Sequence, residues 1–280
     1  MYEQSSLLIA GILFVSMALA IEAGYRAGLR TQTNANESTR AHINSIQASL
    51  LGVLALLLGF TFSLSLQRFD SRSQAIVDES NAIGTTYLRA QLLPVSIRGE
   101  VQKLLQNHIN LRFQSGTVTL DHHEERDELL TQTNQNLDVL WGYARQAAEE
   151  DGQPVTSGLF IQSLNELIDS YGRRNAALER HIPEIILFLL FGTFLLTGGV
   201  VGYAAGVAGH RPSLATHILV ALIVILAFVI IDLDRPRRGL IRVDHKSLID
   251  LKAAIDVSQT VEAQQSVPVD TPRPAVTGRR

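Results

Sequence analysis

The stretch LGFTFSLSLQRFDSR (Leu58–Arg72) passes from strongly apolar residues to a charged surface without a turn residue in between. Proline, which breaks helices, is absent from Val53 to Leu93. The sequence therefore predicts one helix that leaves a bilayer and continues into water. A helix can do so because its backbone hydrogen bonds are satisfied internally in both solvents.

Four apolar segments are long enough to cross a bilayer, which takes roughly 20 apolar residues. They cover residues 5–24, 43–67, 185–209 and 214–231. The first contains a small-residue site at 18–20 typical of a signal peptide, but its MYEQSS start is not basic, so we expect a retained helix. Only 18% of the residues are charged, below the roughly 25% of soluble domains, which also favours a membrane protein.

A polar insert, residues 68–182, separates the second and third spans. Pro94, Gly116 and the turn DGQP (Asp151–Pro154) divide it into four predicted helices, at 68–93, 95–114, 121–150 and 156–182. Apolar stripes at helical spacing predict that they pack as a bundle with Trp141 buried between two of them. The stripes comprise Leu130, Thr133, Leu137, Leu140, Trp141, Ala144 and Ala148, and Phe160, Leu164, Leu167 and Tyr171.

The predicted fold is an all-α integral membrane protein with four transmembrane helices and a cytosolic helical bundle inserted between spans two and three. Five parts are expected. They are spans one and two (1–67), the helical domain (68–182), spans three and four (183–232), a basic elbow with an amphipathic helix (233–256), and a disordered tail (257–280).

Basic residues near the span ends predict the orientation. Ten lie on the side that holds both termini and the insert, and four on the side of the two short loops. Because Lys and Arg are enriched in cytoplasmic loops, both termini and the insert are expected in the cytoplasm.

Thr61, Ser65, Arg68 and Arg72 are spaced by three or four residues and form one polar stripe on the long helix. Two interpretations remain open. Arg68 and Arg72 either anchor the helix among lipid headgroups, or form a cationic vestibule at the mouth of a pore.

The long helix resembles the bestrophin-like family of bacterial four-span membrane proteins in LLGFTFSLSLQRFDSR (Leu57–Arg72) and DESNAIGTTYLRAQLLP (Asp78–Pro94). EAGYRAG (Glu22–Gly28) and DRPRRGLIRV (Asp234–Val243) resemble further hallmarks of that family. True bestrophins, a more distant resemblance, are homopentameric ion channels.

The resemblance implies a homo-oligomer, of five subunits, in the bacterial inner membrane. It also implies a pore lined by span two and an apolar neck at Gly52, Leu56 and Phe60, in which Gly52 departs from the usual bulky residue. With the cationic vestibule, the expected function is an ion channel, selective for anions. The acidic calcium cluster of animal bestrophins has no counterpart here.

Two further features of the sequence can be interpreted either as structural or as functional. Glu22 and Arg26 can form an intramembrane ion pair one helical turn apart. Gly198, Gly202 and Gly206 form a small-residue ridge suited to close helix packing, either within the subunit or between subunits.

Several classes of function are disfavoured. The chain has no cysteine and no phosphate-binding glycine loop, nucleophile elbow or zinc motif, so we expect no enzyme, cofactor or metal site. A net charge of −3 gives no indication of nucleic-acid binding. The alternative to a channel is a non-conducting membrane scaffold or sensor whose helical bundle binds an unknown cytosolic partner.

Overall fold

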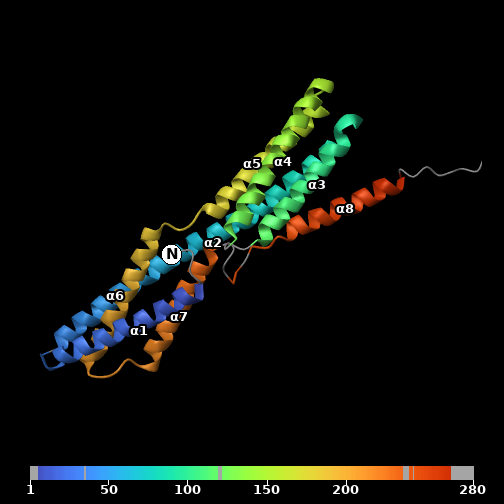
Figure 1. Ribbon diagram of the computed structural model, residues 1–280. Helices are drawn as coiled ribbons and strands as arrows, with labels where there is room; N and C mark the ends of the chain where they lie inside the picture. The colour runs from blue at the N-terminus through green and yellow to red at the C-terminus, as the bar shows by residue number, and fades with distance from the viewer. Residues whose placement is uncertain (1–5, 35, 119–121, 236–239, 242, 266–280) are drawn as a thin grey trace, which may run out of the picture. The chain divides into compact units, whose positions relative to one another are not determined.

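The computed structural model describes residues 6–34, 36–118, 122–235, 240–241 and 243–265, and the regular structure in these ranges is helical (Figure 1). The elements in chain order are α1 (Ser6–Thr31), the short 3₁₀ helix η1 (Gln32–Asn34), α2 (Glu37–Ala90), α3 (Val95–Thr117), α4 (His123–Glu150), α5 (Ser157–Glu179), α6 (Glu184–Ala208), α7 (Leu214–Leu233) and α8 (Lys246–Gln265).

The predicted long helix is confirmed, since α2 is a single helix of 54 residues. Four helical segments are long and apolar enough to span a membrane, as the sequence predicts. Local signals set several boundaries. Pro94 and Pro183 stand at the N-caps of α3 and α6, Ser213 caps α7 by accepting from Thr216 N, and Gly209 ends α6 with φ of 80°.

The α8 helix extends into the segment predicted to be disordered. We expected disorder from Val257 onward, but α8 continues through Val257 to Gln265. Residues 266–280 of the predicted tail lie outside the described ranges.

The chain divides into two compact units. The described residues of 1–75, 122–123 and 169–244 form what we call the membrane unit, and those of 76–118, 124–168 and 245–265 form the helical unit.

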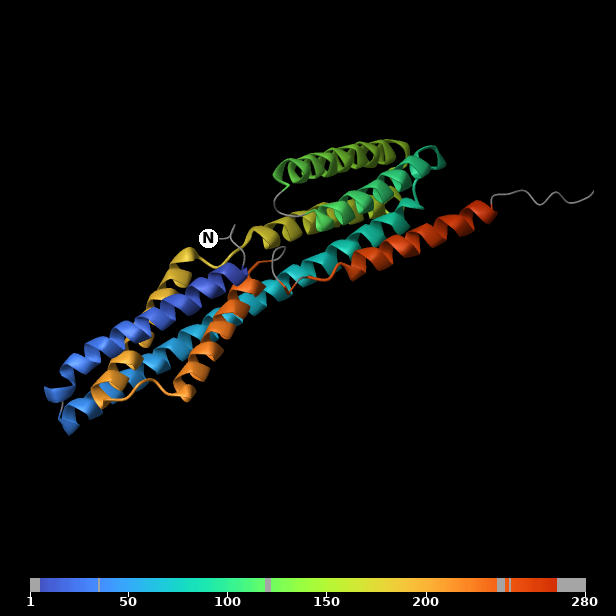
Figure 2. The same cartoon turned by 60° about the horizontal axis from the view of Figure 1, so that its bottom comes forward.

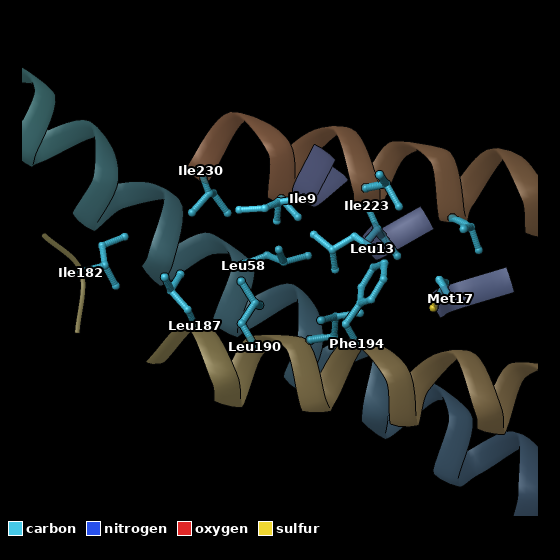
Figure 3. Packing of buried hydrophobic residues seen from close by; sticks show 14 of the residues in the cluster. Ile9, Leu13, Met17, Leu58, Ile182, Leu187, Leu190, Phe194, Ile223 and Ile230 are labelled. Carbon is cyan, nitrogen blue, oxygen red and sulfur yellow. The ribbon is translucent and has the colours of Figure 1, made fainter. Parts of the chain in front are cut away.

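In the membrane unit, α1, α6, α7 and the first part of α2 lie side by side (Figures 1 and 2). Their facing sides are apolar and form one core (Figure 3). Its members include Ile9, Leu13 and Met17 of α1, Leu54 and Leu58 of α2, Leu190 and Phe194 of α6, and Ile223 and Ile230 of α7. The interior of this unit is therefore filled by side chains.

In the helical unit, α3, α4 and the adjoining parts of α2 and α5 bury apolar stripes (Figure 2). Phe160 and Leu164 of α5 are fully buried, as predicted. The α8 helix packs by Leu248, which is 1% exposed, and Leu251 lies against Gly84 of α2. A buried ion pair joins Arg112 Nε to Glu79 Oε1 at 2.6 Å.

The predicted burial of Trp141 is wrong. Its side chain is 38% exposed rather than buried between two helices. The buried stripe of α4 contains Thr133, Leu137, Leu140 and Ala144, as predicted, together with Leu129 and Ala147. At 100° per residue, Trp141 and Ala148 lie on the edge of this stripe, because the helix has rotated slightly from the expected register.

Candidate functional site

One face of α2 is left uncovered where the helix passes through the membrane unit. Leu56 and Phe60 are 59% and 62% exposed, and a side chain at Gly52 would meet nothing within 4 Å. On the opposite face, Leu54 and Leu58 are buried in the apolar core. The three residues expected to form a neck therefore share the face of α2 that the single chain leaves uncovered.

The same face changes character beyond Phe60. The exposed residues that follow on this face are mostly polar, namely Ser63, Gln67, Ser71, Gln74, Asp78 and Asn81, with Asp70 at its edge, but the apolar Leu64 is also exposed there. Because these residues recur every three or four positions on an uninterrupted helix, they continue the line of Leu56 and Phe60.

The stripe of Thr61, Ser65 and Arg72 lies on another side of α2 and is buried. Ser65 Oγ donates to the carbonyl of Ile230 on α7 at 3.1 Å, and Thr61 Oγ1 donates to Leu57 O of its own helix at 2.7 Å. The stripe is therefore a packing surface within the membrane unit.

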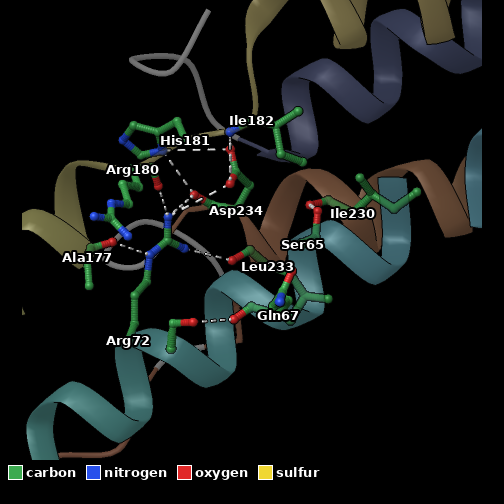
Figure 4. Close-up of polar contacts among 11 residues, drawn as sticks. Ser65, Gln67, Arg72, Ala177, Arg180, His181, Ile182, Ile230, Leu233 and Asp234 are labelled. Carbon is green, nitrogen blue, oxygen red and sulfur yellow. Dashed lines mark hydrogen bonds and ion pairs between the residues drawn. The ribbon is translucent and has the colours of Figure 1, made fainter. Parts of the chain in front are cut away.

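Arg72 is held at the ends of two helices (Figure 4). Its guanidinium donates to Ala177 O at 3.2 Å and Arg180 O at 2.7 Å, at the C-terminus of α5, and to Leu233 O at 3.1 Å and Asp234 O at 3.2 Å, at the C-terminus of α7. Carbonyls at a helix C-terminus lack partners within the helix and carry partial negative charge. One arginine thus donates hydrogen bonds to two carbonyls at each of the two helix ends.

Asp234 completes this arrangement. Its carboxylate lies 3.8 Å from Arg72 Nη2 and accepts from Ile182 N at 3.1 Å, and His181 Nδ1 lies 3.7 Å away (Figure 4). The backbone after α5 is thereby fixed to the end of α7.

The position of Arg72 corrects the sequence interpretation. With 1% of its surface exposed, it lies neither among lipid headgroups nor at an open pore mouth. Arg68 is half-buried, and its Nε is enclosed without a hydrogen-bond partner in the described part of the chain. Arg72 therefore does not line the cationic vestibule that the sequence predicted from Arg68 and Arg72.

The Glu22–Arg26 pair forms, with Arg26 Nε 2.7 Å from Glu22 Oε1. Both side chains are substantially exposed, at 45% and 73%. The pair is a local contact one turn apart on α1 and is not enclosed by other helices.

The glycine ridge of α6 lies against α1. A Cβ at Gly202 would collide with the Ile21 carbonyl, and one at Gly206 with the Tyr25 carbonyl, while Gly198 faces Met17. Sequence reasoning missed the other half of this contact. Gly24 and Gly28 of α1 approach the backbone of α6 equally closely, and their four-residue spacing in EAGYRAG was the available signal.

Metal ligation has no structural support in the described ranges, where no group of three or more His, Asp or Glu residues is suitably arranged. Asp121, at the start of the acidic segment DHHEERDE, lies outside those ranges.

Comparisons with known proteins agree on the family. A family model described as a bestrophin-like domain matches residues 12–248. No curated protein matches the sequence.

Solved structures show the same fold. A bacterial bestrophin homologue from Klebsiella pneumoniae carrying a point mutation is similar with a TM-score of 0.59 and 17% identity, over 85% of this chain and 98% of that one. A membrane protein carrying a point mutation is similar with a TM-score of 0.56 and 16% identity, over 86% and 98% of the two chains. These similarities, together with the long match of the family model, establish that the chain belongs to the bestrophin-like family.

Proposed function

We propose that this protein is an ion channel formed by several copies of the chain, with the uncovered face of α2 lining the pore. The observation that carries the proposal is the line of Gly52, Leu56 and Phe60, which stays uncovered and continues into a polar face on the same helix. Membership of the bestrophin-like family adds weight to it.

The packing of the single chain favours an ion path between copies of the chain over one through a single copy. The membrane unit has a closed apolar core, and the cavity lined by Leu13, Leu58 and Phe194 measures only about 40 Å³. That is room for about three water molecules, and the lining is mostly apolar. A continuous ion path therefore has to run outside this core, where copies of α2 can face one another around an axis.

In such a ring, Leu56 and Phe60 form the constriction. Apolar constrictions obstruct ions because they dewet, so bulky side chains there raise the barrier. Gly52 contributes no side chain, so the constriction is two residues deep. With the insert in the cytoplasm, the polar face of α2 forms the cytoplasmic mouth.

Purified protein in planar bilayers or flux-loaded liposomes tests the proposal. Phe60→Ala should raise ion flux severalfold, because it removes the larger apolar side chain of the constriction. Phe188→Ala on α6 is the matched control, since Phe188 is 59% exposed but lies on another helix. Its flux should equal that of the wild type.

Particle size in nanodiscs provides the second measurement. A symmetric ring with flux raised by Phe60→Ala supports the channel. A monomer or dimer, with wild type and Phe60→Ala both at background flux, overturns the proposal in favour of the membrane scaffold.

A further inference from the structure

A polar pocket lies between α3 and α8 of the helical unit. The two helices run side by side in opposite directions (Figures 1 and 2). The pocket has a volume of about 140 Å³. Each helix contributes to its lining, α3 through Gln106, Ile109 and Asn110, and α8 through Lys252, Ile255 and Asp256.

The base of the pocket is apolar and the groups around it are polar. Ile109 and Ile255 are 2% and 5% exposed, so they belong to the contact between the two helices. Gln106 and Asn110 lie one turn apart on α3 and therefore share one side of that helix. This arrangement suits a small ligand with a polar end and a short apolar part.

Lys252 brings a positive charge to the pocket. Its side chain is half-buried, and its Nζ lies 5.8 Å from the centre of the Phe113 ring, within the range of a cation–π contact. Within the described ranges its ammonium group has no hydrogen bond or ion pair. The other two lysines of the chain, Lys103 and Lys246, are each paired with a carboxylate of their own helix. Lys252 is therefore available to an anionic ligand.

Two side-chain amides add hydrogen-bond donors. Gln106 is half-buried and Asn110 is exposed. Among the residues that the structure describes, neither side-chain amide has a hydrogen-bond partner. Each amide can present its NH₂ group to an acceptor. The pocket thus combines one cationic group with two neutral donors.

Asp256 limits the charge that a ligand can carry. Its carboxylate is exposed, so solvent and salt screen it, but it still disfavours an approaching polyanion. The single ammonium group of Lys252 matches one negative charge. The site therefore suits a monoanion.

We propose that this pocket binds a small organic monocarboxylate. The ammonium group of Lys252 contacts the carboxylate, and the amides of Gln106 and Asn110 donate to its oxygens. The alkyl part of the ligand lies on Ile109 and Ile255. A cavity of about 150 Å³ can hold benzene, so the size of this pocket limits the ligand to about six non-hydrogen atoms. The proposal does not depend on whether the protein conducts ions.

Ligand-observed NMR on the purified full-length protein in nanodiscs tests the proposal with propionate. A ligand of this size should bind with a Kd in roughly the millimolar range. Propionamide has nearly the same shape but no charge, so its binding should be at least about tenfold weaker, because hydrogen bonds to a charged group are stronger. This comparison needs no variant of the protein.

A substitution tests the cationic group. Lys252→Gln should weaken propionate binding roughly tenfold, because it removes the charge and keeps a side chain of similar reach. Lys103→Gln is the matched control, since it removes an exposed lysine from α3 outside the pocket. Its affinity for propionate should equal that of the wild type.

The size of the pocket gives a third measurement. Affinity should rise from acetate to butyrate and then level off at hexanoate, because the additional carbons of hexanoate extend into water. Adsorption to lipid or to an open apolar surface would instead strengthen about fourfold with each added CH₂.

Three results would each overturn the proposal. They are equal binding of propionate and propionamide, an unchanged affinity in Lys252→Gln, and an affinity that continues to rise through hexanoate. None of them bears on the channel, because ion flux through the wild type and Phe60→Ala is measured independently.

Discussion

Buried arginine side chains have different kinds of partner in the two units of the chain. In the membrane unit, the guanidinium of Arg72 is met mainly by four backbone carbonyls. In the helical unit, Arg112 is met by the Glu79 side chain. The helix contacts differ likewise, since α1 and α6 meet glycine against backbone, while α4 and α5 bury stripes of larger side chains.

The solvent explains this difference. Between helices in lipid the hydrophobic effect provides no driving force, so association relies on close van der Waals contact and hydrogen bonds. In water, burying Phe160, Leu140 and Leu164 is favourable in itself. The membrane unit should therefore be sensitive to changes that separate backbones, and the helical unit to changes that remove apolar volume.

The largest effect is expected from Arg72→Met. This substitution removes the guanidinium that four carbonyls share and the arginine partner of the Asp234 carboxylate, at a cost of roughly 3–5 kcal/mol. Unfolding of the purified protein by SDS titration measures it. Arg40→Met, at an exposed arginine, is the control and should cost little.

Matching variants at Arg112 provide a comparison for the Arg72 variants. Arg112→Met should also destabilise, but adding Glu79→Leu should recover most of the loss, because both charges of the pair are then removed. Adding Asp234→Asn to Arg72→Met should recover little, because the carbonyls remain. Equal recovery in the two double variants would show that the two sites are equivalent.

An intermediate effect is expected from Gly202→Ala. The new Cβ would overlap the Ile21 carbonyl and force α1 away from α6, at a cost of roughly 1–3 kcal/mol. Gly192→Ala, on the same helix with nothing within 4 Å, is the matched control. It should be neutral or gain roughly 0.5–1 kcal/mol, because alanine favours helices. The same SDS titration compares them, and equal stabilities would refute the close crossing.

The smallest effect is expected from Trp141→Ala. Since Trp141 is 38% exposed, its loss should cost about 1 kcal/mol or less, whereas Phe160→Ala should cost roughly 3–5 kcal/mol. Thermal melting followed by circular dichroism compares the two variants. Trp141 is the only tryptophan, so its fluorescence reports this position alone and should show contact with water. An emission typical of a buried indole would contradict the structure.

Sequence patterns predicted the helices well because their signals are local. Pro94 and Pro183 mark helix starts whatever the rest of the chain does. Which face of a helix meets which partner is not local. The spacing of Thr61, Ser65 and Arg72 defines a polar stripe, but its acceptors, such as Ile230 O and Leu233 O, lie more than 150 residues away in sequence.

The same limit applies to the neck residues and to Trp141. Periodicity gives Leu56 and Phe60 a common face, but only packing of the other helices determines that this face stays uncovered. Trp141 lies at the edge of its stripe, where a small rotation decides between burial and exposure.

The α1–α6 contact can form only late in the synthesis of the chain. Gly24 meets Gly199, which is 175 residues further along the chain. At about 5–20 residues per second, α1 has to wait roughly 10–35 seconds in the bilayer before α6 leaves the ribosome. During that interval the glycine face of α1 has only lipid, the membrane insertion machinery or α2 as neighbours. The first span to enter the membrane is thus among the last to reach its final contacts.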